Sequence, residues 1–418
     1  MQDHKGNVIN SKHVVIRSYD EDKDCARVED LVRRCEVGPA GRGFLYTDTL
    51  GDPICRIRNS PVYEMLVAEM DNELVGVIQG SIKVVTIQIS PRDMAKVGYV
   101  LGLRVAPTYR RKRIGSSLVC SLEDWFVSNG VEYAYMATEK DNEASVQLFV
   151  DRLGYTQFRS PSILVNPVNQ FRRLRISSSI EIKKLTPEDA VPMYKRCLGS
   201  AEFFPHDIDT ILNNKLSLGT WVAYYKTDPW KSNSNNNNYN NNSNSSSSIN
   251  NSTGFSDNGR YGPSNWAMLS VWNSGELFKL RLGNAPLSCM IYTKSSKLMD
   301  RFLPCFKVPS IPDFFSPFGF YFIYGLHSEG TRSGKLVRNL CRFVHNMATK
   351  SSSKDCKAIV TEVGSGDRIR VHIPHWKLLS CPEDLWCIKA MRGKERGNLH
   401  QLTTTPPTAP LFVDPREV

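Results

Sequence analysis

The sequence predicts an α/β protein in which a mixed sheet flanked by helices occurs twice in tandem, with the second copy degenerate. Two observations lead to this prediction. Apolar segments of strand length alternate with amphipathic helical segments between residues 14 and 165. The same order restarts at Ile180, where IEIKKLTPEDAVPMYKRCL resembles the earlier VVIRSYDEDKDCARVEDLV. A chain of 418 residues is long enough for two such cores.

The first unit is expected at residues 13–178, after a flexible tail at 1–12. Its expected elements are strand 14–18, helix 20–34, strand 63–69, strand 73–85, strand 99–105, helix 114–130, strand 133–138, helix 142–152, a strand from 154 and a closing strand at 162–165. The stretch at 87–97 carries Pro91 and is expected to be a short link. The long connection at 36–60 is a candidate cover for an acceptor site, because long loops often carry function.

The second unit is expected at residues 179–391. After a strand and a helix that start at Ile180, its expected elements are strand 219–225, strand 266–272, strand 320–326, helix 334–348, strand 358–363 and a final pair of strands at 375–380 and 385–390. An insertion at 231–258, rich in Asn and Ser, has almost nothing to bury and is expected to be disordered. The extension at 392–418 is expected to run over the surface.

A basic loop between a strand and a helix is the most informative segment. The apolar strand Tyr99–Val105 leads to Pro107, four cations follow at Arg110–Arg113, and a helix begins at Ile114. The first turn of a helix has free backbone N–H groups and a partial positive charge, so anions bind there. We interpret the loop as a cradle for a pyrophosphate. A nuclear import signal and a solvated charge run are the competing interpretations of the same cations.

Two motifs in this order resemble motifs A and B of the GNAT acetyltransferase superfamily. The phosphate loop of that superfamily reads Arg/Gln-x-x-Gly-x-Gly/Ala, and here Arg110 and Gly115 match its ends while Arg113 replaces the middle glycine. Downstream, NEASVQLF (142–149) followed by LGY (153–155) resembles Asn-x-x-Ala-x-x-Leu-Tyr and Gly-Phe. Both motifs in the right order, joined by a helix and a strand, make the resemblance specific.

The resemblance extends to one plant family. The segments CEVGPAG, LGDPICRIRNSP, SPSILVNP, FFPHDID, LNNKLSLGT, IPHWKLLSC and FVDPRE resemble the HOOKLESS-type N-acetyltransferases, and they lie from about residue 35 to the C-terminus. The resemblance implies a role in the nucleus, downstream of hormones that shape plant growth. The expected location is therefore the nucleus, or the nucleus and the cytoplasm.

The resemblance also implies acetyl-CoA as the co-substrate. Backbone amides of the loop hold its pyrophosphate, the strand before the loop pairs with its pantetheine arm, and an N–H group of that strand polarises the thioester carbonyl. The implied cofactor residues are Leu103, Arg104, Val105, Arg110, Arg111, Lys112, Arg113, Ile114, Gly115, Ser116, Asn142 and Ser145. For Asn142 and Ser145, capping and packing of their own helix is an equal alternative. The second unit has EGTRSG (329–334) at the corresponding place, with one cation, and is expected to have lost the cofactor.

The implied reaction is attack of a neutral amine on the thioester, with an acid for the leaving thiolate and a base for the amine. The usual acid of the superfamily is the motif B tyrosine, and Phe149 stands there instead. Tyr155, and after it Tyr135, are the substitutes by proximity in sequence. Glu139 is the first candidate for the base, with helix capping as the competing interpretation, and Glu69 is the second.

The composition restricts the class of protein and its partners. The net charge of +11 suits anionic partners, but no Lys/Arg face interleaved with aromatic residues indicates a sequence-specific nucleic-acid platform. None of the eleven cysteines forms a CxxC pair, so we expect free thiols and no metal; His372, His375 and Cys381 are read as structural. No apolar run approaches the ~20 residues of a membrane helix, so no membrane partner is expected.

Two functional hypotheses follow. The first is an N-acetyltransferase that acetylates the amine of a protein lysine, with histones among the candidate acceptors. The alternative is a non-catalytic regulator or scaffold that retains the fold and binds CoA or partner proteins, because Arg113 and Phe149 depart from both motifs. A third hypothesis, a DNA-binding transcription factor, is supported by the net charge alone.

Overall fold

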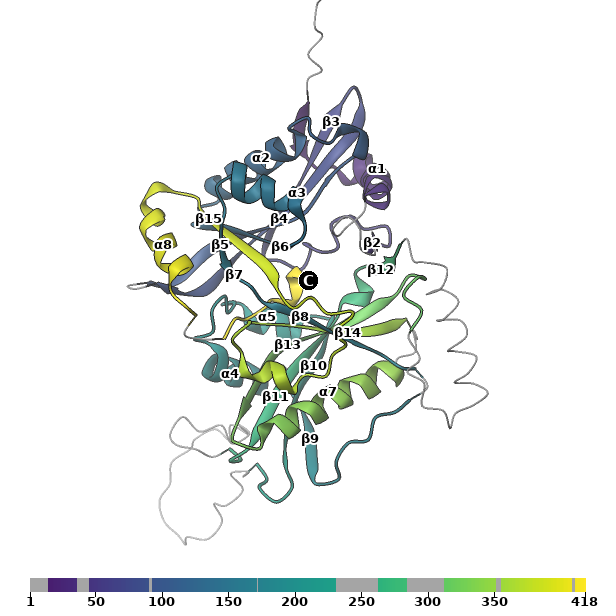
Figure 1. The fold of residues 1–418 in the computed structure, drawn as a ribbon, viewed down its shortest axis with the longest axis vertical. Helices are drawn as coiled ribbons and strands as arrows, with labels where there is room; N and C mark the ends of the chain where they lie inside the picture. The colour runs from purple at the N-terminus through teal and green to yellow at the C-terminus, as the bar shows by residue number, and fades with distance from the viewer. Residues whose placement is uncertain are drawn as a thin grey trace, which may run out of the picture.

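Two mixed sheets share a hydrophobic core in a computed structural model of the protein (Figure 1). The structure describes residues 14–35, 45–89, 92–170, 172–230, 262–283, 312–350, 355–407 and 410–418. The tail predicted at 1–12 and the insertion predicted at 231–258 lie outside these residues. None of the described helices is long and apolar enough to cross a membrane.

The first sheet contains the basic loop and its neighbours. In spatial order its strands are β1 (Val15–Ser18), β3 (Val62–Met70), β4 (Glu73–Ile89), β5 (Arg92–Val105), β6 (Tyr133–Glu139), β15 (Asp384–Ala390) and β7 (Thr156–Arg159). Its helices are α1 (Glu21–Arg34), α2 (Ile114–Ser128) and α3 (Glu143–Val146), which continues as a π-helical turn at Gln147–Arg152. Among these strands β5 and β6 are the parallel neighbours, and α2 connects them.

The second sheet repeats this arrangement. In spatial order its strands are β8 (Ser162–Pro167), β14 (Cys356–Val363), β13 (Gly319–Glu329), β11 (Trp266–Asn273), β10 (Ser217–Tyr225) and β9 (Ile180–Leu185). Its helices are α4 (Pro187–Leu198), α5 (Ile208–Asn213) and α7 (Ser333–Lys350). The parallel neighbours β13 and β14 are connected by α7, as β5 and β6 are by α2. This repetition confirms the predicted tandem fold.

The two units exchange their last strands. β8, which follows the first unit in the chain, pairs with β14 of the second sheet. β15, which follows the second unit, inserts between β6 and β7 of the first sheet. The sequence analysis placed both strands in the unit that precedes them, and that assignment was wrong because local patterning does not specify which strand is the neighbour. A strand was also predicted at 375–380, where the chain instead forms a turn.

A long hairpin replaces the short link predicted at 87–97. β4 runs to Ile89 and β5 begins at Arg92, and their register extends from Gly76 opposite Val105 to Ile89 opposite Arg92. A smaller two-stranded sheet joins the units, because β2 (Leu45–Asp48) pairs with β12 (Lys279–Leu282). The connection predicted as a cover therefore attaches to the second unit.

Two glycines let α2 approach the first sheet closely. A Cβ atom added at Gly98 would lie 2.7 Å from the ring of Phe126, and one at Gly80 would lie 2.7 Å from Leu122 Cδ1. Leu118, Leu122 and Phe126 are fully buried on this face, as the helical periodicity predicts. The close packing holds the N-terminus of α2 beside the end of β5.

The C-terminal extension does not run over the surface as predicted. After α8 (Arg396–Thr404) the chain turns inward, and Phe412, Asp414 and Arg416 are each at most 3% exposed. Asp414 accepts hydrogen bonds from Arg416 and forms an ion pair with Lys83 of β4 at 3.2 Å. This tail thus forms part of the core between the two sheets, and three buried charges hold it there.

Removal of the Asp414 carboxylate is expected to destabilise the protein strongly. Burial alone would raise the pKa of Asp414, but Arg416 and Lys83 outweigh burial and lower it. The stabilisation is therefore complete near neutral pH and is lost only in strong acid, as the carboxylate protonates. Asp414→Ala leaves buried cations without this partner, and we expect a loss of about 3–5 kcal/mol in the free energy of unfolding.

Urea denaturation of the wild type and of Asp414→Ala at pH 7 measures this loss in the free energy of unfolding. Asp209→Ala removes an exposed carboxylate of the neighbouring helix α5 and serves as the control. Equal stabilities for the two variants would contradict the role assigned to the tail.

Candidate active site

A β-bulge separates the parallel strands β5 and β6. Their pairing ends at Val100 opposite Met136. Immediately afterwards β5 shifts register against β4, so that Gly102 and Leu103 face the single residue Ile78. Gly102 has φ +64°, which glycine adopts without strain. We call the resulting opening, between residues 101–105 of β5 and 137–139 of β6, the splay.

The basic loop lies at the open end of this strand pair. Arg111 and Arg113 have φ values of 61° and 64°, in the left-handed region. Counting from Arg111, Ser117 is the first residue whose backbone amide has a backbone acceptor. It donates to the carbonyl of Arg113 at 3.0 Å. Among the described residues nothing accepts the amides of residues 111–116, and no side chain caps α2. The loop thus presents a set of free N–H groups at a helix N-terminus, as an anion site requires.

The cations of the loop are available to a ligand. Arg110, Arg111, Lys112 and Arg113 are all exposed, and within the described part of the chain none forms an ion pair. Lys112 lies over the ring of Tyr109 at 4.8 Å. Arg113 does not plug the turn, because its left-handed backbone keeps the amide in place and its side chain lies outside. The substitution of the superfamily's middle glycine is therefore compatible with a phosphate cradle.

Strand, loop and motif B converge at Gly115. A Cβ atom added there would lie 3.7 Å from Val105 Cγ2, 3.7 Å from Leu148 Cδ2 and 3.9 Å from Leu103 Cδ2. These are ordinary contacts, so the fold alone does not require glycine at this position. Ser116 donates its hydroxyl hydrogen to the carbonyl of Arg113 at 2.7 Å. Asn142 caps α3, because its Oδ1 accepts the amide of Ser145 at 3.3 Å.

The two predicted catalytic residues lie in different surroundings. Glu139 is the last residue of β6, half-buried at the splay, and faces Asp384 across the β6–β15 pair. Tyr155 is 2% exposed and lies on the helical side of the sheet, where its ring meets Phe149 edge-on at 5.2 Å. Its phenol lies near Glu123, nine residues along α2 from Ile114, and the helical rise puts that about 13 Å from the loop. The structure does not bring Tyr155 to the splay.

A group of carboxyls that the sequence analysis missed lies on the other face of the sheet. Glu362 of β14 accepts a hydrogen bond from the indole Nε1 of Trp386 at 3.0 Å. Burial and the charges of Asp384 and Glu417 raise the pKa of Glu362 to about 8. Burial and Glu139 raise the pKa of Asp384 to about 7. No sequence motif marks these groups, because the strand exchange alone brings them to the splay.

Two arginines form a basic counterpart to the carboxyls. The guanidinium of Arg104 donates to the carbonyl of Leu103 at 2.8 Å, and its Nε has no partner. Arg56, from the connection predicted as a cover, also has an unpartnered Nε and lies over the ring of Phe278 at 5.6 Å. Burial and the nearby Arg56 lower the pKa of Arg104 to about 10. Buried donors without partners are costly, so they favour an acceptor group from a ligand.

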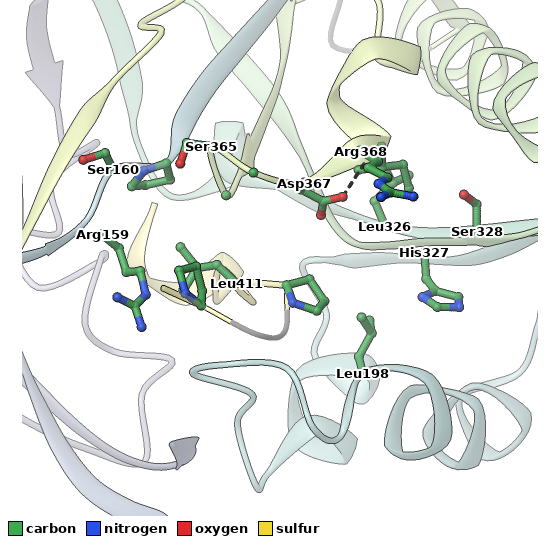
Figure 2. A pocket seen from close by; sticks show the side chains of 16 residues that line it. Arg159, Ser160, Leu198, Leu326, His327, Ser328, Ser365, Asp367, Arg368 and Leu411 are labelled. Carbon is green, nitrogen blue, oxygen red and sulfur yellow. Dashed lines mark hydrogen bonds between the residues drawn. The ribbon is translucent and has the colours of Figure 1, made fainter. Parts of the chain in front are cut away.

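The second unit has a pocket at the equivalent end of its own parallel strands, β13 and β14, but no phosphate cradle. A pocket of about 460 Å³ lies between the end of β13 and the loop after β14, where Figure 2 shows His327, Asp367 and Arg368 around it. At the start of α7 the amide of Arg332 donates to Asn265 Oδ1 at 2.7 Å. A Cβ atom added at Gly334 would lie 2.5 Å from the imidazole of His372. These contacts occupy the turn, which agrees with the predicted loss of the cofactor in this unit.

One group of possible metal ligands occurs among the described residues, and it is not the one noted in the sequence. Cys197, His327 and Glu329 each place a ligand atom within 4.8 Å of the others. His372 instead covers Gly334, and His375 bonds to the carbonyl of Ile373. Three ligands at these separations do not complete a tetrahedral shell, and we assign no metal to the group.

Comparison with known proteins gives concordant results. The profile of the acetyltransferase (GNAT) family matches residues 26–155. The chain is 45% identical over 427 residues to "Probable N-acetyltransferase HLS1-like" of Arabidopsis thaliana, covering 97% of this chain and 99% of that protein. It is 46% identical over 419 residues to "Probable N-acetyltransferase HLS1" of the same plant, covering 96% and 99%.

A solved structure shares the fold of nearly the whole chain. N-myristoyltransferase of Saccharomyces cerevisiae with bound myristoyl-CoA superimposes with a TM-score of 0.53 and 9% identity, over 93% of this chain and 81% of that one. At this identity the likeness concerns the fold alone. The family match is what indicates an acyl-CoA co-substrate at the first unit.

Replacement of Arg113 by glycine is expected to stabilise the protein. A residue with a Cβ atom in the left-handed region costs about 1–2 kcal/mol, and the entropy of glycine offsets about half of the gain. Arg113→Gly should therefore raise the free energy of unfolding by about 0.5–1 kcal/mol. Arg110→Gly is the control, because Arg110 has φ −63° and relieves no strain. Chemical denaturation that ranks Arg110→Gly as the more stable variant would contradict the strained loop.

Proposed function

Because the chain belongs to the HLS1 family of GNAT N-acetyltransferases, we propose that it transfers the acetyl group of acetyl-CoA to a lysine side chain of a protein. The family membership confirms the resemblance carried by motifs A and B, and acyl transfer to an amine follows from it. The acetyl group, the lysine and the identity of the acceptor protein are the proposed parts.

The observation that carries the proposal is the set of free amides at the start of α2, directly after the splayed end of β5. The loop suits a diphosphate, and the half-buried edge of residues 102–105 suits an extended arm that ends in a thioester. One strand–loop–helix segment therefore supports both ends of the same cofactor.

Aromatic packing supports a short acyl group. On the face toward the second unit, the ring of Tyr135 lies 4.8 Å from Tyr99, 5.6 Å from Trp386 and 4.9 Å from Phe203. All four side chains are at least 92% buried, so this face is filled beneath the splay. A two-carbon acyl group needs no further space there.

The carboxyls at the splay support an amine acceptor that arrives as a cation. Glu139, Asp384 and Glu362 lie where an ammonium group would approach the thioester, and a lysine carries such a group at neutral pH. We extend the proposal to histone lysines and to a role in the nucleus, in hormone-dependent growth. The support for this extension is the relationship to the plant family.

The non-catalytic alternative rests on Phe149. This residue stands where the superfamily has its acid, is 3% exposed and cannot donate a proton. A scaffold that binds acetyl-CoA without turnover would fit this substitution. Acetylation of a lysine peptide, followed by mass spectrometry, separates the two functions.

Charge reversal at the loop is expected to abolish cofactor binding. Arg111→Glu with Arg113→Glu retains two side chains with a Cβ atom but places carboxylates beside the diphosphate. We expect acetyl-CoA affinity to fall at least about hundredfold, since each lost charge-assisted bond contributes about 1.5–3 kcal/mol. Isothermal titration calorimetry measures the change.

The matched control makes the same charge change at the second unit. Arg332→Glu with Lys335→Glu alters the start of α7, where the Arg332 amide is already bonded. Its acetyl-CoA affinity should equal that of the wild type. A wild-type protein that binds no acetyl-CoA, or a control that loses as much affinity as the loop variant, would contradict the assignment of the site. For the acceptor, wild-type protein that leaves histone-tail and other lysine peptides unmodified would refute the lysine proposal.

A further inference from the structure

A carboxyl of the second unit lies at the mouth of the splay in the first. Glu362 belongs to β14, and its Oε1 accepts the indole hydrogen of Trp386. Trp386 pairs with Ala137, the first residue of β6 beyond the pairing with β5. The indole therefore fixes this carboxyl beside the point where the two parallel strands separate.

A buried phenol without a partner faces the same point. Tyr99 pairs with Tyr135 two residues before the splay and is 8% exposed. Its hydroxyl has no hydrogen-bond partner in the described part of the chain, and the oxygen itself is not fully buried. Burial and the charges of Glu417, Glu362 and Asp384 raise the pKa of Tyr99, while Arg56 opposes them. The hydroxyl is therefore able to form a hydrogen bond with a polar group of a ligand.

Among the neighbouring carboxyls, Glu362 is the one with an oxygen atom free to accept a hydrogen bond from a ligand. Glu417 is held by Lys83 at 2.7 Å and accepts the phenol hydrogen of Tyr135. Asp384 is 6% exposed and lies opposite another carboxyl residue, Glu139, across the β6–β15 pair. Glu362 is half-buried and uses one oxygen for Trp386, so its other oxygen is free to meet an incoming group.

We propose that the Glu362 carboxylate takes the proton from the acceptor amine, and that the Tyr99 hydroxyl binds this amine beside it. The proposal rests on acetyl transfer to an amine and deepens it: the base comes from the second unit, and Glu139 and Tyr155 are not required. The degenerate unit thus supplies a catalytic group to the unit that holds the cofactor.

The proposed step balances as follows. Glu362 accepts one proton from the ammonium group, and the nitrogen lone pair then forms a bond to the carbonyl carbon of the thioester. The carbon–sulfur bond breaks, and its electron pair leaves with the CoA sulfur. The second proton of the amine passes to that sulfur through water. The proton on Glu362 returns to solvent, which its half-buried side chain contacts.

The surroundings make Glu362 a better base than an ordinary carboxylate. The pKa of an ordinary glutamate is about 4.3 and that of a lysine ammonium group is about 10.4. Proton transfer from the ammonium group to such a glutamate is therefore unfavourable by ~6 orders of magnitude. Burial, Asp384 and Glu417 bring the pKa of Glu362 to about 8, which narrows the gap to between two and three orders of magnitude. The other charged or titratable groups that act on this cluster include Tyr99, Tyr135, Glu139, Arg56, Lys83 and Asp414.

Glu362→Gln tests the base with butylamine as the acceptor and thiol release as the signal. Glutamine keeps the size and the acceptor for Trp386, so folding should be retained, and calorimetry should give unchanged acetyl-CoA affinity. We expect kcat to fall about 10²–10⁴-fold. In the wild type kcat/KM should rise with pH and level off above about pH 8, because the raised pKa keeps the carboxyl protonated below that. In the Glu362→Gln variant this rise of kcat/KM with pH, the pH limb, should disappear.

Glu329→Gln is the matched control, because Glu329 ends the adjacent strand β13 with a side chain that is 56% exposed. Its rate and pH profile should equal those of the wild type. A Glu362→Gln protein with wild-type kcat and the same pH limb would overturn the proposal. Turnover of butylamine without turnover of any lysine peptide would instead contradict only the lysine acceptor.

Tyr99→Phe removes one hydroxyl and tests amine binding directly. Saturation-transfer NMR with butylammonium at pH 9 and saturating acetyl-CoA reports binding even without turnover. We expect at least tenfold weaker binding in Tyr99→Phe and in Glu362→Gln, and none of this loss in Glu329→Gln. Equal binding in all four proteins, including the wild type, would refute the amine site at these two residues.

Discussion

The separation of β5 from β6 is the constraint on which the site depends. Two residues of β5, Gly102 and Leu103, face one residue of β4, and this bulge turns the rest of β5 away from its parallel neighbour. Beyond Val100 and Met136 the two strands no longer pair with each other, and residues 102–105 are half-buried. A strand edge of this kind suits an extended ligand. α2 packs closely over Gly80 and Gly98, and this packing holds its N-terminus beside the strand end.

The two units depend on each other because they exchange strands. β15 provides Trp386 and Asp384 to the first sheet, and β8 completes the second sheet beside β14. The C-terminal tail then crosses the shared core with Asp414, Arg416 and Glu417 buried against Lys83. A charged cluster at such a depth is stable only when each charge has a partner. The second unit therefore contributes residues to the site although its own phosphate turn is occupied by Asn265 and His372.

The basic loop between β5 and α2 was predictable because its signal is local. A strand, a run of cations and an amphipathic helix occur within one continuous segment, and the structure places them as expected. The left-handed conformation of Arg111 and Arg113 was beyond such a prediction, since nothing in the composition of the loop requires it. The hairpin of β4 and β5 was missed because Pro91 and polar neighbours suggested a link. The extension at 392–418 was misjudged because local sequence does not reveal that Asp414 and Arg416 find buried partners in the core.

The sequence by itself determined the alternation of strands and helices, the tandem repeat and the basic turn before α2, because these follow from hydrophobic periodicity and from residues that are close in the chain. Only the tertiary structure decided which strands are neighbours and which carboxyls meet. Glu139, Asp384 and Glu362 come from three distant segments, and they meet because β15 pairs with β6 and its tryptophan reaches β14. The pKa of Glu362 has the same origin, since burial and neighbouring charge are properties of the packed protein and of no segment alone.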